Sequence, residues 1–163
     1  SPAGEVTAML DPGTDAPSFS LPNQHGETVS LESLDADYTV VYFYPRADTP
    51  GCTTEACGFR DAWDRFAEAD VAVVGISDDP VGDLADFADK YDLPFHLLSD
   101  ADGSVADAYD SYGEKNVFGN VVDGVFRNTY VVDAAGEIVL AYEGVDPEDH
   151  AEAILADVAD ERA

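Results

Sequence analysis

The sequence predicts an α/β fold in which a central mixed sheet is flanked by helices and preceded by an N-terminal hairpin. Two kinds of pattern support this prediction. Runs of β-branched and aromatic residues, TVVYFY at 39–44 and VAVVGI at 71–76, are typical of strands buried on both faces. Stretches with a helical spacing of apolar residues alternate with these runs, as they do where helices pack on a sheet.

The predicted elements follow one another along the whole chain. Pro and Gly are frequent as far as Pro17, so the chain opens as a loop. After it we expect a hairpin of 19–21 and 28–31 around the turn NQHG, strands at 39–44, 71–76 and 95–98, helices at 52–69, 81–91 and 104–112, a hairpin of 129–132 and 138–142 around the turn DAAG, and a helix at 147–158. Pro147 would lie in the first turn of that last helix, where its missing N–H costs no hydrogen bond. This order fits a thioredoxin-like fold, and because no linker or repeat interrupts it, residues 1–163 are expected to form one domain.

The charge of the chain is strongly one-sided. It has 35 acidic and 7 basic residues, which give a net charge of -28. The acidic residues are spread among apolar runs, so they indicate a folded protein with an acidic surface rather than a disordered chain. Such a surface repels nucleic-acid phosphates and anionic lipids, and neither is expected as a partner. Molar salt shortens the Debye length to about 3 Å, so the surface indicates adaptation to a high-salt cytoplasm.

The sequence also favours a reducing location. No apolar run is long enough to span a bilayer, and the first residues lack the basic and apolar regions of a signal peptide. The 2 cysteines are too few for a disulfide framework. We therefore expect a cytoplasmic protein, in which a cysteine pair is more often catalytic or metal-binding than structural.

Both cysteines lie in the segment TPGCTTEAC, where a strand is expected to lead into a helix. Thr49 is suited to cap the helix with its side-chain oxygen, and Pro50 suits the first helical position. Cys52 would then lie in the first turn, where free N–H groups and the helix dipole lower the pKa of a thiol. A pKa of about 6 instead of 8.5 raises the thiolate fraction at pH 7 only about 30-fold, whereas catalysis typically requires about 10⁶-fold. Donors that stabilise charge on a substrate are needed as well.

These residues carry a family resemblance. Pro45, Thr49 and Cys52 in PRADTPGC match the PxxxTxxC signature of peroxiredoxins. The run FYPRADTPGCTTEACGFRD resembles the subgroup called bacterioferritin comigratory protein, or Q-type peroxiredoxin, and the likeness continues through GISDDP, KYDLPFHLLSD, YGEKN and RNTYVVDAAGEI. Two departures bear on the lining of the pocket: Tyr112 stands where the family often has Trp, and Tyr130 where it often has Phe.

The resemblance implies a thiol-dependent peroxidase that reduces hydrogen peroxide and organic hydroperoxides. Cys52 would attack the peroxide O–O bond and become a sulfenic acid, and Cys57 would condense with it to a disulfide. Thr49 would hydrogen-bond the peroxide, Arg127 would stabilise the thiolate and polarise the peroxide, and Pro45 would shield the sulfur from water. A thioredoxin-like protein would reduce the disulfide. The resemblance further implies no metal or organic cofactor, and a monomer or weak oligomer.

The spacing of the two cysteines limits when they can join. Residues five apart in an intact helix have Cα atoms about 8–9 Å apart, whereas a disulfide requires less than about 7 Å. Gly58, a poor helix former, follows Cys57 directly. We therefore expect the helix to unwind around residues 52–57 on oxidation.

Each of these residues also has an interpretation without catalysis. A cysteine is often a small buried hydrophobic residue, an arginine a surface ion-pair partner, a proline the end of a strand and a threonine only a helix cap. Glu55 and Arg60 either tune the site or belong to a solvated helix face. The three histidines are scattered over different elements, so a metal site shared with the cysteines is not expected.

Two other functions stay open at this point. The cysteine pair could serve a dithiol–disulfide oxidoreductase or a redox sensor, although the usual reductase motif CxxC is absent. The chain could also be a non-catalytic acidic interaction protein, in which both cysteines would be expendable.

Overall fold

A computed structural model describes residues 10–117 and 119–162 of the chain. Its elements, in order, are β1 (Ser20–Pro22), β2 (Thr28–Ser30), a 3₁₀ turn (Leu31–Ser33), β3 (Tyr38–Phe43), α1 (Pro50–Asp61), α2 (Trp63–Glu68), β4 (Val71–Ser77), α3 (Val81–Tyr91), β5 (His96–Ser99), α4 (Ser104–Ala108), β6 (Tyr112–Val117), β7 (Asn120–Val125), β8 (Thr129–Asp133), β9 (Ile138–Tyr142) and α5 (His150–Arg162). No helix among the described residues is both long and apolar enough to cross a membrane.

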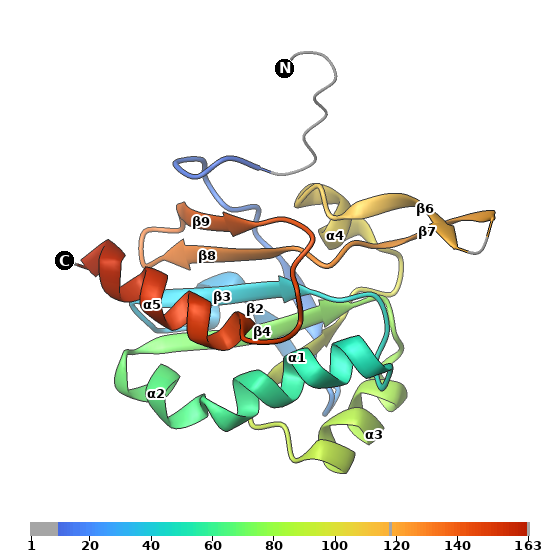
Figure 1. The fold of residues 1–163 in the computed structure, drawn as a ribbon, viewed down its shortest axis with the longest axis horizontal. Helices are drawn as coiled ribbons and strands as arrows, with labels where there is room; N and C mark the ends of the chain where they lie inside the picture. Colours follow the sequence, from blue (N-terminus) through green and yellow to red (C-terminus); the bar gives the residue numbers. More distant parts are fainter. Residues whose placement is uncertain (1–9, 118, 163) are drawn as a thin grey trace.

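A five-stranded mixed sheet forms the centre of the fold, with the strand order β5-β4-β3-β8-β9 (Figure 1). Strand β3 pairs in parallel with β4, and β4 pairs in parallel with β5. Strand β8 runs antiparallel to both β3 and β9. Strands β1 and β2 form a separate antiparallel hairpin. The mixed sheet, the flanking helices and the N-terminal hairpin of the predicted fold class are thus confirmed.

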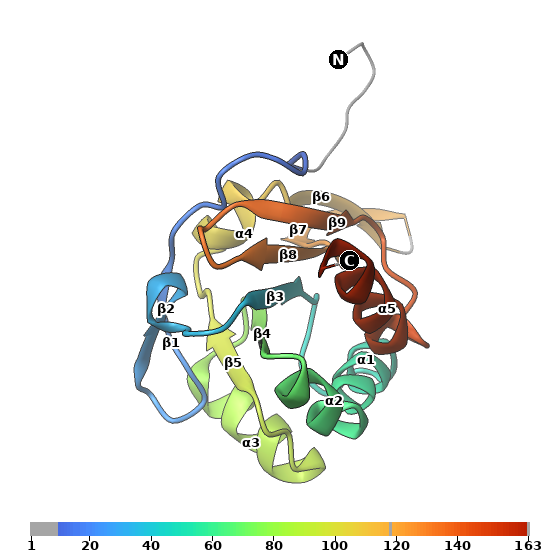
Figure 2. The ribbon, with the colours of Figure 1, turned by 90° about the vertical axis from the view of Figure 1, so that its left-hand side faces the viewer.

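The two faces of the sheet are covered unequally. On β3, Val40 and Tyr42 belong to the core on the side of α1, α2, α3 and α5, whereas Val41 and Phe43 belong to the core on the opposite side. The N-terminal hairpin and α4 cover that opposite side, as the edge-on view of Figure 2 shows. Every residue of β3 from 39 to 43 is buried, which explains why its sequence is a continuous apolar run.

Two predicted helices have different limits from those expected. The helix expected at 52–69 is divided at Ala62, which leaves helical geometry with φ -94 and ψ 6 and caps both α1 and α2. The helix expected to start at Pro147 begins at His150, because Asp149 has a φ of 61° and a left-handed residue cannot continue a right-handed helix. Pro147 therefore lies in the preceding loop and not in a first helical turn.

The segment after Asp100 also differs from the prediction. The helix expected at 104–112 ends at Ala108, and the left-handed Asp110, with φ 52°, follows it. The antiparallel hairpin of β6 and β7, which extends from the body in Figure 1, was missed altogether. Its strands are rich in Gly and polar residues, so they lack the alternating apolar pattern from which a strand is predicted.

Candidate active site

The candidate site lies at the edge of the sheet where β3 ends. Strand β3 leads through the loop 45–49 into α1, so the first turn of α1 lies beside the carboxyl ends of β3 and β4 (Figure 1). Strand β8 runs the other way, and its first residue Thr129 is opposite Tyr42 near the end of β3. The residue two positions before β8 is Arg127. Antiparallel pairing therefore brings Arg127 to the same edge as the first turn of α1.

Helix α1 begins with the expected residues but without the expected cap. Thr49 is the N-cap in an extended conformation and Pro50 takes the first helical position, as predicted. The hydroxyl of Thr49, however, donates a hydrogen bond to the carbonyl of Arg46 at 2.9 Å, and no side-chain cap is formed. The prediction of a side-chain cap is therefore wrong. Thr49 takes part in the helix only through its backbone carbonyl, which accepts a hydrogen bond from the N–H of Thr53 at 2.8 Å.

The two cysteines have different surroundings within one continuous helix. Cys52 is 1% exposed and belongs to the core on the helical side of the sheet. Cys57 is half-buried, and burial is the main cause that raises the pKa of its thiol. Both thiols are free. The structure thus corresponds to the reduced protein, with α1 intact from Pro50 to Asp61.

Arg127 lies against the first turn of α1. Its guanidinium donates to Glu55 Oε1 at 3.0 Å and lies beside Gly51, the residue before Cys52. Burial lowers the pKa of Arg127, but the interactions with Cys52 and Glu55 outweigh burial and raise it. Gly51 leaves room for this arrangement, since a Cβ there would lie 3.0 Å from Nη2 of Arg127. Arg127 is therefore more than a surface ion-pair partner.

Glu55 is a buried carboxyl group rather than part of a solvated helix face. Its side chain is 0% exposed, and its Oε2 atom has no hydrogen-bond partner among the described residues. Burial raises its pKa to about 7, although the charge of Arg127 and the hydrogen bond to it act in the opposite direction. Near neutral pH the carboxyl group therefore exists in both protonation states. The sequence had left the role of Glu55 open, because a helical Glu looks the same whether it is buried or exposed.

Two tyrosines of β3 and its extension lie beneath the site. Tyr42 stacks on Phe59 of α1 with ring centroids 4.7 Å apart, and its hydroxyl is buried without a partner among the described residues. Burial is the main cause that raises the pKa of both Tyr42 and Tyr44, and the charges of Cys52 and Glu55 add to it. Both tyrosines are therefore neutral, and both lie in the core beside Cys52. Sequence reasoning assigned them only to a buried strand, although their alternate positions in TVVYFY could have placed them on one face.

The loop that carries Pro45 is anchored by Asp79, which the sequence analysis had not singled out. Asp79 follows β4, is buried, and accepts hydrogen bonds from the N–H of Ala47 at 2.7 Å and the hydroxyl of Ser77 at 2.8 Å. Arg46 adds an ion pair at 3.4 Å. Pro45 itself is half-buried and begins this loop. Of the predicted site residues, Pro45 and Thr49 thus lie in the loop that leads into α1, and Cys52 lies in the first turn of α1. Arg127, two residues before β8, lies against Gly51 and Glu55 of the same helix.

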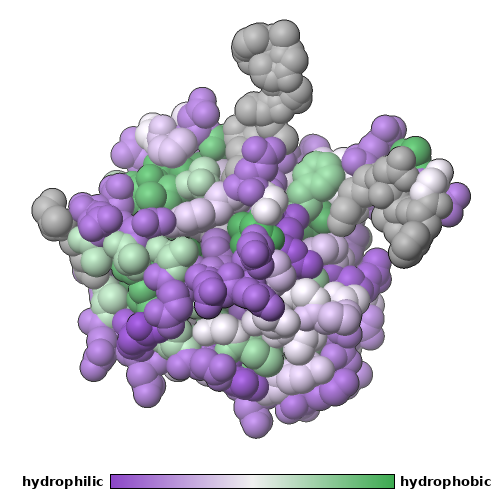
Figure 3. All heavy atoms as spheres, in the orientation of Figure 1, coloured by the Kyte–Doolittle hydropathy of each residue, from purple (hydrophilic) through white to green (hydrophobic). Residues whose placement is uncertain are grey.

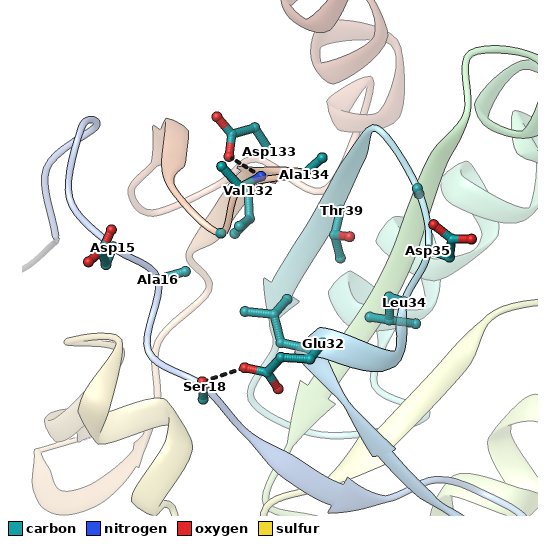
Figure 4. A pocket seen from close by; sticks show the side chains of 14 residues that line it. Asp15, Ala16, Ser18, Glu32, Leu34, Asp35, Thr39, Val132, Asp133 and Ala134 are labelled. Carbon is teal, nitrogen blue, oxygen red and sulfur yellow. Dashed lines mark hydrogen bonds between the residues drawn. The ribbon is translucent and has the colours of Figure 1, made fainter.

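A hollow of about 640 Å³ lies elsewhere, beside the last residues of β8 and the segment after β2 (Figure 4). It is lined by carboxylates together with small and aliphatic side chains, and neither cysteine contributes to it. The carboxylates are Asp15, Glu32, Asp35 and Asp133. Among the described residues, no three His, Cys, Asp or Glu side chains are grouped closely enough to hold a metal ion. The thiol site is therefore separate from this hollow.

Known proteins share this fold and sequence. Residues 12–141 match the AhpC/TSA family. A peroxiredoxin of Mycobacterium tuberculosis (strain CDC 1551 / Oshkosh) is 46% identical over 153 residues, which cover 94% of this chain and 98% of the relative. Peroxiredoxin Bcp of Escherichia coli (strain K12) is 42% identical over 146 residues, covering 90% of this chain and 94% of the relative. The solved structure of the bacterioferritin comigratory protein of Xanthomonas campestris has a TM-score of 0.86 and 31% identity, covering 94% of this chain and 100% of that one.

The chain therefore belongs to the AhpC/TSA family and is a thiol-dependent peroxidase of the peroxiredoxin class. Within that class it belongs to the bacterioferritin comigratory protein, or Q-type, subgroup. The resemblance stated from the cysteine segment is thus confirmed along nearly the whole chain.

Proposed function

We propose that this peroxiredoxin reduces hydrogen peroxide and organic hydroperoxides with Cys52 as the attacking thiolate and Cys57 as the resolving thiol. The observation that supports it most is the buried Cys52 in the first turn of α1, against which the guanidinium of Arg127 lies at Gly51. The related protein of Xanthomonas campestris was solved in a study of its alkyl peroxide reduction activity, which supports a hydroperoxide as substrate.

In the first step the Cys52 thiolate attacks one peroxide oxygen of ROOH. A new S–O bond forms, the O–O bond breaks, and RO⁻ leaves and takes a proton to become ROH, which leaves Cys52 as a sulfenic acid. The fixed charge of Arg127 stabilises the negative charge that develops on the departing oxygen. The Thr49 hydroxyl already donates its proton to the Arg46 carbonyl. Its oxygen is therefore left to accept a hydrogen bond from the O–H of the peroxide, which orients the substrate.

In the second step the Cys57 thiolate attacks the sulfur of the sulfenic acid. An S–S bond forms, the S–O bond breaks, and hydroxide leaves as water once it takes a proton. An intact α1 holds the two Cα atoms about 8–9 Å apart, beyond the limit of about 7 Å for a disulfide. The helix must therefore unwind. Unwinding also exposes Cys57, and this removes the burial that raises the pKa of its thiol.

A thioredoxin-like protein is proposed as the reductant that restores both thiols. Its thiolate would attack the disulfide and its second thiol would complete the exchange, so that two electrons pass to the peroxiredoxin. Peroxiredoxins are reduced by proteins of this kind, which supports the proposal.

One experiment tests the proposed roles. The reduced protein is mixed with one equivalent of peroxide while the fluorescence of Trp63 is followed, since this residue starts α2 directly after the cysteine helix and lies 5.9 Å from the ring of Phe95. Peroxide loss is measured in parallel for Cys52→Ser and Cys57→Ser. We expect Cys52→Ser to consume no peroxide and Cys57→Ser to consume one equivalent without forming an intramolecular disulfide. Peroxide consumption that survives Cys52→Ser would contradict the proposal.

We also propose that the protein works in a high-salt cytoplasm as a monomer or weak oligomer, without nucleic-acid or membrane partners. The net charge of -28 and the predominantly hydrophilic face in Figure 3 support this view. At molar salt the repulsion among surface carboxylates is screened within about 3 Å. The midpoint of thermal unfolding should therefore rise between dilute buffer and molar potassium chloride. A midpoint that is higher in dilute buffer would overturn the high-salt proposal.

A further inference from the structure

Helix α1 is attached at both of its ends to the last turn of α3. Before the helix, the carboxylate of Asp48 accepts hydrogen bonds from Lys90 Nζ at 3.0 Å and from the Tyr91 hydroxyl at 2.9 Å. Near the end of the helix, Arg60 donates from Nη1 to the backbone carbonyl of Tyr91 at 2.8 Å. Both cysteines lie between these two attachments. Lys90 also lies over the ring of Tyr91, 5.4 Å from its centroid, so the two residues of α3 support each other.

The attachment at Asp48 joins the loop before α1 to α3. Asp48 has a φ of 59°, in the left-handed region, which Asp adopts more readily than most residues with a Cβ. Lys90 and Tyr91 both donate to its side chain. When these two contacts break, the loop loses its link to α3 at this point, while Ala47 stays bonded to Asp79.

We propose that Asp48, Lys90 and Tyr91 form a clamp on α1 that controls how readily the helix unwinds, and thereby sets the rate at which oxidised Cys52 is resolved by Cys57. This inference rests on the proposed function. The three residues are positioning residues, because they act through the helix and do not contact the reacting sulfur. Breaking the clamp makes unwinding easier and so accelerates disulfide formation.

The first step is controlled from the other side of the helix. Arg127 contacts Glu55 on the buried side of α1, whereas the clamp is made of the exposed Asp48 and Lys90 and the half-buried Tyr91. Weakening the clamp therefore leaves the reaction of reduced Cys52 with peroxide unchanged. Only the steps after the sulfenic acid has formed depend on how easily α1 unwinds.

The clamp also decides how much enzyme is lost to over-oxidation. A sulfenic acid that waits for Cys57 can react with a second ROOH, which gives a sulfinic acid and ROH. Resolution and this second oxidation compete for the same intermediate. A tighter clamp therefore yields more sulfinic acid at high peroxide concentration, and a looser clamp yields less.

Two variants break the clamp without touching the thiols. Lys90→Gln removes the ion pair with Asp48, and Tyr91→Phe removes only the hydroxyl while keeping the carbonyl that binds Arg60. Exposed pairs of this kind are worth little, so we expect disulfide formation to accelerate about two- to fivefold in each variant. The rate of the first reaction with peroxide should stay within about twofold of the wild type. The sulfinic fraction at excess peroxide, measured by mass spectrometry, should fall.

Controls separate the clamp from a general loss of stability. Arg65→Gln removes an exposed ion pair with Glu152 that joins α2 to α5, and it should leave the resolution rate unchanged. Lys90→Arg keeps the charge and should restore the wild-type rate. Because salt screens the exposed pair of Lys90 and Asp48, resolution in the wild type should also accelerate with potassium chloride more than in Lys90→Gln.

Three outcomes would overturn the proposal. Lys90→Gln and Tyr91→Phe could both resolve at the wild-type rate with an unchanged sulfinic fraction, or they could alter the first reaction as much as the second. In either case the wild type still forms its disulfide, so the clamp fails while the proposed function stands. If non-reducing peptide mapping finds no disulfide between Cys52 and Cys57 in the oxidised wild type, the proposed function fails and the clamp fails with it.

Discussion

The segment of α1 around Cys52 and Glu55 differs from the segment around Cys57 and Gly58 in burial and contacts, although both belong to one helix. Cys52 and Glu55 are buried, and Glu55 forms an ion pair with Arg127. The turn with Cys57 and Gly58 is half-buried, and a Cβ at Gly58 would meet no atom within 4 Å. The thiol proposed to react with peroxide is thus buried, whereas the thiol proposed to move is half-buried and is held through its neighbours Phe59 and Arg60.

The strongest way to break this comparison is to remove each thiol in turn. Cys52→Ser should lower the rate of peroxide reduction by more than about 10³-fold, because a serine hydroxyl supplies no thiolate at neutral pH. Cys57→Ser should leave the first turnover intact and abolish only recycling by a disulfide-specific reductant. Single-turnover stopped-flow measurements separate the two effects. Equal losses of the first turnover in both variants would mean that the two cysteines do not act in separate steps.

Arg127→Gln tests the contribution of the guanidinium on the buried side of α1. Loss of its charge and forked donors should lower the second-order rate constant with peroxide by about 10²–10³-fold, as when a donor to a developing charge is removed. Arg127→Lys should recover only part of this loss, since a single ammonium cannot serve both Cys52 and Glu55 with the same geometry. Arg65→Gln is a matched control on an exposed ion pair. A rate loss below about tenfold in Arg127→Gln would contradict the assigned role.

Glu55→Gln sharpens the comparison through the pH dependence of stability. The carboxyl group has a pKa of about 7 in the folded protein, raised from 4.5 mainly by burial, so between these values the folded state binds more protons than the unfolded state. Stability therefore falls as pH rises from about 4.5 to about 7, by about 3 kcal/mol in all. Glutamine stays neutral, so the variant should lack this fall. Urea unfolding of both proteins at pH 5 and pH 8 measures the difference.

The wild type alone would not reveal this effect clearly, because His150 acts in the opposite direction. Burial lowers the pKa of His150 to about 4, so stability rises as pH increases from about 4 to about 6.5. His150 is present in both proteins, and its contribution cancels in the difference between them. The same pH dependence in Glu55→Gln as in the wild type would show that the carboxyl group is not buried as described.

The smallest effect is expected from a substitution at Gly58, next to Cys57. Gly58→Ala adds a methyl group in open space and favours the helix by about 0.5–1 kcal/mol. Resolution by Cys57 should then slow about two- to fivefold, while the first reaction with peroxide keeps its rate. Quenched-flow trapping of free thiols follows both steps. A faster resolution in this variant would show that unwinding at Gly58 does not limit disulfide formation.

The parts of the fold that could be predicted are those with long apolar patterns. The apolar run TVVYFY and the periodic segment 81–91 gave β3 and α3 with nearly the observed limits, since burial on two faces or on one stripe leaves a clear signature. The limits that failed depend on single backbone conformations. Asp149 and Asp110 adopt left-handed values that stop a helix, and an aspartate in the sequence does not reveal this.

The candidate site was predictable as a motif but not as a geometry. Cys52 and Arg127 are 75 positions apart, and only the antiparallel pairing of β8 with β3 brings them together. The sequence could not show that Glu55 is buried against Arg127, because burial depends on which face of α1 meets the sheet. Asp79 was missed for the same reason: among 35 acidic residues, the one that anchors the loop before α1 has no distinguishing pattern.

The division of the long helix at Ala62 has a further consequence. Unwinding of a regular helix travels along it, because each hydrogen bond that opens frees the next. Here Phe66 of α2 is fully buried in the core that also contains Val71 and Val73 of β4, so α2 is anchored by contacts other than those with α1. Ala62 thus marks the edge of a cooperative unit. The proposed unwinding of α1 can therefore stop at Ala62 and leave the adjoining helix and the core beneath it folded.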